Sequence, residues 1–272
     1  MARFIVTVKK LHKRSRIPAS LPSVLHISGI VAEGFAFEAE EVNSSDLPDT
    51  RLGSWFRDVD GNFYWGGGIS PLDAGDRLLT AGQVAAATGA HQTTAERFLP
   101  YLSDLCTEIA LNTPARQLAF LAQVGHESGG LFYTEELDSG SAYEGRHDLG
   151  NTHPDDGVRY KGRGLIQITG RNNYQWLSNS FKVDFVNDPE KLGARNAAVC
   201  TPEQLSFATR SAGWFWQNNG LNAVADKLAL DQPIDEGENL EVYRLLTRKI
   251  NGGYNGLNDR INKFKAGLEL FL

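Results

Sequence analysis

The spacing of apolar residues changes its period once along the chain, near residues 71–79. Before this segment, Phe4, Val6 and Val8 occupy every second position, as in a half-buried strand. After it, apolar residues recur at the three- and four-residue spacing of helices. The segment between carries proline and glycine, which is typical of a linker. We therefore expect a multidomain α+β chain, with a small all-β barrel at 1–75 and a mainly α-helical domain at 76–272.

Two aromatic segments, residues 54–59 and 62–65, flank the dipeptide Asp60-Gly61 and predict a β-hairpin. Short strands separated by glycine and proline favour a small barrel. A basic cluster and several tryptophans accompany these strands. They either contact a glycan or peptide, or they form a solvated face and a barrel core. The cluster consists of Lys9, Lys10, Lys13, Arg14 and Arg16.

Helix-start signals recur in the second half of the chain. Thr80 with Gln83, and Thr93 with Glu96, fit capping boxes. Thr113 before Pro114 predicts the start of a helix that ends at Glu127. Further helices are expected at three places, from Thr201-Pro202 to about Asn219, over 239–250, and after Gly256-Leu257.

Composition excludes several classes of function. The net charge of −6 and the pI near 5.6 argue against nucleic acid as a partner, because phosphate binding needs a basic surface. No run approaches the roughly 20 apolar residues of a membrane span, and the N-terminal apolar run is too short for a signal peptide. We expect a monomer without cofactor or metal, made in the cytoplasm. Cys106 and Cys200 are expected to be buried apolar residues rather than nucleophiles.

Glu127 is the first candidate for chemistry. It closes an apolar helix at the negative end of the helix dipole, where the dipole and burial both raise a carboxyl pKa. A glycosidase needs such a protonated carboxyl to donate a proton to the leaving sugar oxygen. The ordinary alternative is a helix-ending glutamate that points into water before a glycine cap.

A second polar segment runs through residues 160–174. An extended backbone there would place Gln167 and Thr169 on one side and Ile166 and Ile168 on the other, a suitable floor for a sugar cleft. Taken alone, this segment is equally a glycine-bounded hairpin, and Asn251-Gly252-Gly253 is a turn.

Zinc chemistry is a weaker alternative. His126-Glu127 begins a zinc-protease pattern, but Gly130 stands where the second histidine is required. A nearby group of acidic residues and histidines lacks a recognisable ligand spacing. That group consists of His147, Asp148, His153, Asp155 and Asp156.

Four segments, 126–130, 134–136, 160–174 and 250–260, occur in the order found in one enzyme family. Together they make the chain from about 80 to 270 resemble the family 19 glycoside hydrolases, which include chitinases and phage endolysins. The resemblance implies a lysozyme-like domain and an inverting mechanism. It implies Glu127 as general acid, Glu136 as general base and Thr169 as a residue that holds the attacking water. Substrate contacts are expected from Gln167, Asn251, Tyr174 and His126.

The general base is assigned less securely than the general acid. The family often has Glu-Asn-Leu at this position, whereas this chain has Glu135-Glu136-Leu137, so Glu135 is an alternative and Glu144 a third candidate. The N-terminal segment resembles the bacterial Src-homology-3-like barrels of cell-wall enzymes, through residues 11–16, 34–37 and 55–65.

We therefore expect an endolysin-type glycosidase that hydrolyses β-1,4 bonds of peptidoglycan. The alternatives are a chitinase acting on chitin oligomers and a non-catalytic, chitinase-like glycan-binding protein. Delivery to the wall would need a holin-like pore or a secretion machine.

Overall fold

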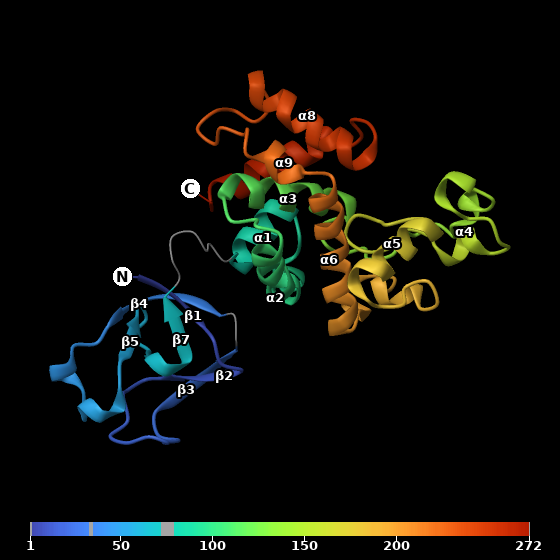
Figure 1. Cartoon of the computed structure of the whole chain (residues 1–272). Coiled ribbons are helices and arrows are strands. Elements are labelled where there is room, and N and C mark those ends of the chain that lie inside the picture. The colour runs from blue at the N-terminus through green and yellow to red at the C-terminus, as the bar shows by residue number, and fades with distance from the viewer. Residues whose placement is uncertain (1, 33–34, 72–78, 272) are drawn as a thin grey trace. The chain divides into compact units, whose positions relative to one another are not determined.

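The computed structural model describes residues 2–32, 35–71 and 79–271. The chain divides into two compact units, Met1–Leu78 and Leu79–Leu272 (Figure 1). Most of the expected linker, residues 72–78, lies outside the described residues.

The N-terminal unit contains one antiparallel sheet. Its strand order is β3-β2-β6-β5-β4-β1-β7. The predicted hairpin is confirmed, since β5 pairs with β6 and Trp55 lies opposite Trp65. Among the described residues β3 and β7 do not pair, so the sheet is observed while the closed barrel stays a prediction. The strands are β1 (Ala2–Val6), β2 (Lys10–Arg14), β3 (Ile27–Ala32), β4 (Ala36–Glu41), β5 (Trp55–Asp58), β6 (Phe63–Trp65) and β7 (Ile69–Pro71).

Two residues of this unit lie in its interior, whereas Trp65 and the cluster residues Lys9, Lys10 and Arg16 are exposed. Trp55 is fully buried among apolar side chains, so it belongs to the core. Arg14 is also buried, and its guanidinium donates to the carbonyls of Leu25 (2.6 Å) and Ser23 (2.7 Å). Arg14 is therefore not part of a basic surface.

The C-terminal unit is mainly helical. The capping boxes of Thr80 and Thr201 are confirmed. The one predicted at Thr93 is wrong, because the helix already begins at Gln92 and Thr93 lies in its first turn. The helices are α1 (Ala81–Thr88), α2 (Gln92–Glu108), α3 (Pro114–Glu127), α4 (Asp156–Arg159), α5 (Arg171–Phe181), α6 (Pro202–Asn218), α7 (Leu221–Ala225), α8 (Gly237–Asn251) and α9 (Leu257–Leu268).

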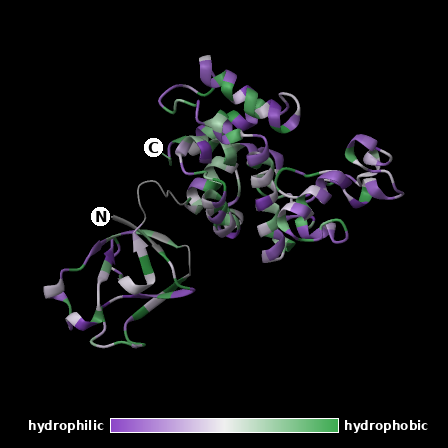
Figure 2. Ribbon diagram, viewed as in Figure 1, coloured by the Kyte–Doolittle hydropathy of each residue, from purple (hydrophilic) through white to green (hydrophobic). Residues whose placement is uncertain are grey.

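Helix α3 lies in the core and positions the candidate acid. Apolar side chains such as Leu118 and Val124 are completely buried, and α3 packs against α1 and α9. Gly125 allows a close approach of α1, because a Cβ there would lie 2.5 Å from the Thr88 carbonyl oxygen. Apolar and polar residues are interspersed along the surrounding helices, as expected where each helix buries one face (Figure 2). The C-terminal end of α3 is thus rigidly held.

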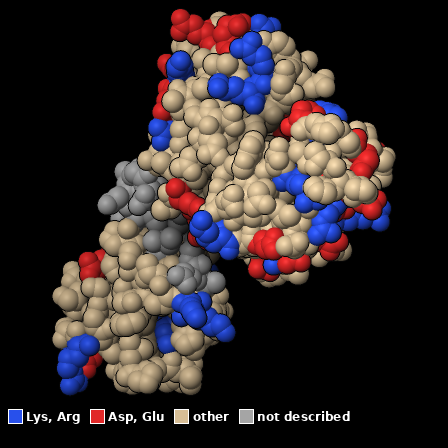
Figure 3. All heavy atoms as spheres, turned by 45° about the vertical axis from the view of Figure 1, so that its right-hand side comes forward, with Lys and Arg blue, Asp and Glu red and all other residues tan. Residues whose placement is uncertain are grey.

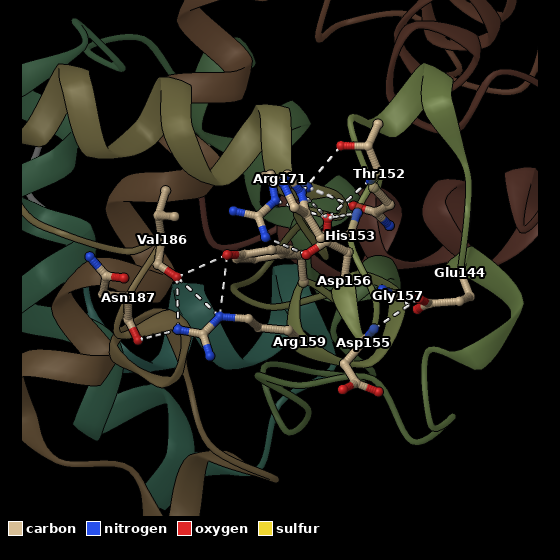
Figure 4. Close-up of polar contacts among 12 residues, drawn as sticks. Glu144, Thr152, His153, Asp155, Asp156, Gly157, Arg159, Arg171, Val186 and Asn187 are labelled. Atoms are coloured by element: carbon tan, nitrogen blue, oxygen red, sulfur yellow. Dashed lines mark hydrogen bonds and ion pairs between the residues drawn. The ribbon is translucent and has the colours of Figure 1, made fainter.

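The segment 138–160 contains α4 and two short 3-10 turns. The buried carboxylate of Asp156 accepts from the amides of Thr152 and His153 (both 3.0 Å) and from the Arg171 side chain (Figure 4). Burial alone would raise the pKa of Asp156, but these hydrogen bonds, led by that from Arg171, lower it to about 2. Polar contacts therefore help to hold this segment in place.

Acidic and basic side chains are interspersed over the face shown in Figure 3. No helix in the described part of the chain is long and apolar enough to cross a membrane. Both cysteines are buried, as predicted, and burial raises the pKa of the Cys106 thiol to about 12.

Candidate functional site

Glu127 is the last residue of α3, as predicted, and its carboxylate is bound by a buried cation. Arg260, on α9, donates from Nη2 to Glu127 Oε1. Its Nη1 donates to Oε1 of Gln123, one helical turn before Glu127, over 2.5 Å. The Arg260 side chain is 1% exposed and that of Glu127 19% exposed. Arg260 is thus a residue of the candidate site to which the sequence assigned no role, although it closes the fourth matching segment.

Asn251 organises the loop between α8 and α9. Its Oδ1 accepts from the amide of Gly253 and its Nδ2 donates to the carbonyl of Asn255, both over 2.9 Å. The same carbonyl accepts from Nε of Arg260 at 3.4 Å. Asn251 is exposed, so it both shapes this loop and remains accessible to a ligand.

His126 links α3 to α9. Its Nδ1 lies 2.7 Å from Oδ2 of Asp259, and its ring packs against Gly256, where a Cβ would lie 2.1 Å from Nε2. The expected substrate contact remains a prediction, while the observed contacts fix the orientation of the ring.

Glu136 and Gln167 meet around Gly162. A Cβ on Gly162 would lie 2.9 Å from both Glu136 Oε2 and Gln167 Oε1. Glu136 Oε2 accepts from the Tyr143 hydroxyl over 3.1 Å. Burial and the neighbouring charge of Glu136 raise the pKa of Tyr143, which keeps this hydroxyl protonated as a donor. The two remaining oxygens, Glu136 Oε1 and Gln167 Oε1, are buried and have no hydrogen-bond partner among the described residues.

In the other two candidate bases, both carboxylate oxygens have a polar partner. Glu135 forms ion pairs with Lys161 (2.9 Å) and Arg163 (2.8 Å). Glu144 accepts from the amides of Asp155 and Gly157, both over 2.8 Å. Of the three, Glu136 alone keeps a carboxylate oxygen without a partner. The geometry therefore favours Glu136.

The segment 163–169 is a turn, and the expectation of an extended strand is wrong. Arg163 and Ile168 exchange two backbone hydrogen bonds (3.1 and 2.7 Å), and Gln167 has a φ of 55°. The turn still buries both isoleucines and leaves Gln167 and Thr169 partly exposed. The Thr169 hydroxyl donates to the Gln167 carbonyl over 2.9 Å, so it stabilises the turn.

Tyr174 does not reach a ligand surface. It is completely buried, donates to the carbonyl of Lys161 (2.7 Å) and accepts from Nη1 of Arg163 (3.1 Å). We correct the expected substrate contact accordingly, because Tyr174 positions the segment that carries Lys161 and Arg163.

A cleft of about 940 Å³ is lined by Glu135, Lys161 and Arg163 among others. Neither Glu127 nor Glu136 lines it. Within the described residues no group of three histidine, cysteine or acidic side chains is arranged to hold a metal ion.

Sequence comparisons relate the chain to known glycoside hydrolases. No protein-family model matches the chain. A glycosyl hydrolase family 19 domain-containing protein of Haemophilus influenzae is 27% identical over 186 residues, which cover 56% of this chain and 78% of that protein. The chain is a homologue of the family 19 glycosyl hydrolases. The prediction of a glycoside hydrolase is thereby supported.

Other relatives of this family 19 homologue are plant enzymes. Acidic endochitinase Q of Nicotiana tabacum is 30% identical over 153 residues, which cover 53% of this chain and 54% of that protein. The chain thus spans about half the length of this plant relative. Among solved structures, chitinase C from Streptomyces griseus HUT6037 aligns with a TM-score of 0.48 and 20% identity, over 71% of this chain and 92% of that one.

Proposed function

We propose that this family 19 homologue hydrolyses β-1,4 bonds of the peptidoglycan glycan by inversion. Glu127 acts as general acid and Glu136 as general base. Gln167 and Asn251 contact the N-acetylhexosamine units, and Thr169 supports the Gln167 turn beside the attacking water.

The observation that carries this proposal is the pair of buried, unpartnered oxygens on Glu136 and Gln167. A buried acceptor without a partner costs free energy, about 1–3 kcal/mol, so its retention points to a bound water or ligand that donates a hydrogen bond there. A water bound to Glu136 Oε1 is positioned for activation by the carboxylate, and the enclosed Gln167 Oε1 is a second acceptor for such a water.

An inverting mechanism requires a particular distance between the acid and base carboxyl groups. The acid and base carboxyls should lie about 6.5–9.5 Å apart, leaving room for the water, whereas about 5 Å would indicate retention. The anomeric configuration of the first product, followed by proton NMR, tests this part of the proposal.

The N-terminal sheet is proposed to be a barrel that anchors the enzyme to the wall. Such a module raises the local enzyme concentration without altering the catalytic unit. Delivery through a holin-like pore or a secretion machine belongs to the same proposal.

Chitin is the second candidate substrate, because plant relatives are named endochitinases and both polymers contain β-1,4-linked N-acetylglucosamine. The test compares turbidity loss of purified sacculi with product release from chitin oligomers, using the same enzyme concentration. Faster release from chitin would assign the chain as a chitinase. Turnover of neither polymer would favour the non-catalytic alternative.

A further inference from the structure

Two segments of helices α5 and α6 carry no charged residue. Residues 172–181 and 211–220, here called the neutral strip, contain no Asp, Glu, Lys or Arg, although the guanidinium of Arg210 lies over the Phe181 ring, 4.5 Å from its centroid. With 22% charged residues in the chain, twenty positions would carry roughly four. Amides occupy five of the exposed positions instead. These are Asn172, Gln175, Asn179, Gln217 and Asn218.

A tryptophan stands in the middle of these amides. Trp176 is 55% exposed, and its indole has no hydrogen-bond partner among the described residues. Ser180, one turn further along α5, lies on the same helix face, about 5–6 Å away at Cβ. The Ser180 hydroxyl accepts from Nε1 of Trp214 on α6 over 3.1 Å. Trp214 is half-buried against the apolar cluster of Phe181 and its neighbours. Ser180 therefore contacts the indole of Trp214 and shares a helix face with Trp176.

We infer that the neutral strip is a second, non-catalytic binding site for an uncharged glycan chain. The exposed face of Trp176 offers a flat apolar platform to the C–H face of a pyranose ring, and the amides bind its hydroxyl and acetamido groups. A nucleic acid or an acidic peptide would instead require a cluster of unpaired cations. The neutral strip itself has none, and the adjacent Arg171 and Arg210 are paired with Asp156 and Glu108.

The neutral strip lies next to the candidate catalytic turn, as a site for a long glycan chain requires. Helix α5 begins at Arg171, two residues after Thr169, so the neutral strip starts where the candidate catalytic turn ends. The Asn173 side chain donates to the Thr169 carbonyl over 2.7 Å, which ties the two segments together. A glycan longer than the catalytic site could thus be held along α5 between cleavage events. This inference rests on the proposed function only for the identity of the glycan.

The test measures binding and turnover separately. Trp176→Ala is introduced into the parent chain and into the Glu127→Gln chain, with Val199→Ala as a control for another exposed apolar side chain, 64% exposed. Trp176→Ala should weaken adsorption of the Glu127→Gln chain to insoluble chitin and to sacculi by about tenfold, the size expected for an anchoring aromatic. In the parent chain it should leave turnover of chitotetraose unchanged. Val199→Ala should alter neither.

Tryptophan fluorescence provides an independent readout. Added N-acetylglucosamine oligomers should shift the emission to shorter wavelength, and Trp176→Phe should remove that shift while keeping a stacking platform. Unchanged adsorption in Trp176→Ala would overturn the inference. Loss of chitotetraose turnover would also overturn it, by placing Trp176 in the catalytic cleft. Absence of turnover in the parent chain would refute the proposed function alone, because adsorption is measured without it.

Discussion

Replacing Glu127 with glutamine should separate the chemical role of this residue from its structural one. The amide keeps an oxygen that accepts from Arg260 but cannot donate a proton to a leaving group. Loss of a general acid typically lowers the rate about 10²–10⁴-fold, and we expect kcat to fall by this factor.

The same change should have a modest cost in stability. A hydrogen bond to a charged group contributes about 1.5–3 kcal/mol and a neutral one about 0.5–1.5 kcal/mol, so the free energy of unfolding should fall by about 1 kcal/mol. Arg260 keeps its bond to Gln123, and Glu127 lies at the edge of the solvent with 19% exposure. The full cost of a broken buried pair, about 3–5 kcal/mol, should therefore not appear.

Urea unfolding and turnover of a soluble chitin oligomer measure the two effects on one preparation. Glu135→Gln is the control, because Glu135 is also 19% exposed and paired with an arginine, and in addition with Lys161. It should lose at least as much stability while keeping turnover. Turnover at the parent rate in Glu127→Gln would refute the assignment of the acid, and a loss above 3 kcal/mol would refute the energetic argument.

Three further results are expected. Glu136→Gln should lower turnover about 10²–10⁴-fold and leave oligosaccharide affinity within twofold, measured by initial rates and calorimetry; a dead Glu135→Gln with an active Glu136→Gln would move the base by one residue. Asp156→Asn should reduce the free energy of unfolding by about 2 kcal/mol near pH 6. The folded pKa of Asp156, about 2, lies below the ordinary 3.8, so the stabilisation is complete above pH 3.8 and is lost as the pH falls towards 2. The free energies of unfolding of the parent and Asp156→Asn chains, measured in urea from pH 6 to pH 2, should therefore converge. A difference that stays constant over this range would contradict the pairing. A chain of residues 76–272 should fold, cleave soluble oligomers at the full rate and lose activity on intact sacculi; equal activity on sacculi would refute anchoring, and failure to fold would refute the domain boundary.

The features predicted well from sequence depend on neighbouring residues. The α3 helix begins after Thr113 and ends at Glu127 because its cap, its proline and its apolar stripe are local signals. The β5–β6 hairpin follows in the same way from the dipeptide between its strands.

The features missed depend on residues far apart in the chain. Glu135 and Glu136 are indistinguishable by sequence, and the difference comes from Lys161 and Arg163, at least 25 positions later. The burial of Tyr174 is likewise set by tertiary packing. The turn at Gln167 was missed because a positive φ is unusual for glutamine and has no pattern in the sequence.

The pairing of Glu127 with Arg260 has a consequence for the order in which the enzyme matures. The two residues are separated by 133 positions, so during synthesis the acid leaves the ribosome long before its cation. Until α9 docks on α3, Glu127 lacks the partner that fixes its carboxylate. A nascent or C-terminally shortened polypeptide should accordingly be inert, and catalytic competence should arise only as the last helix closes.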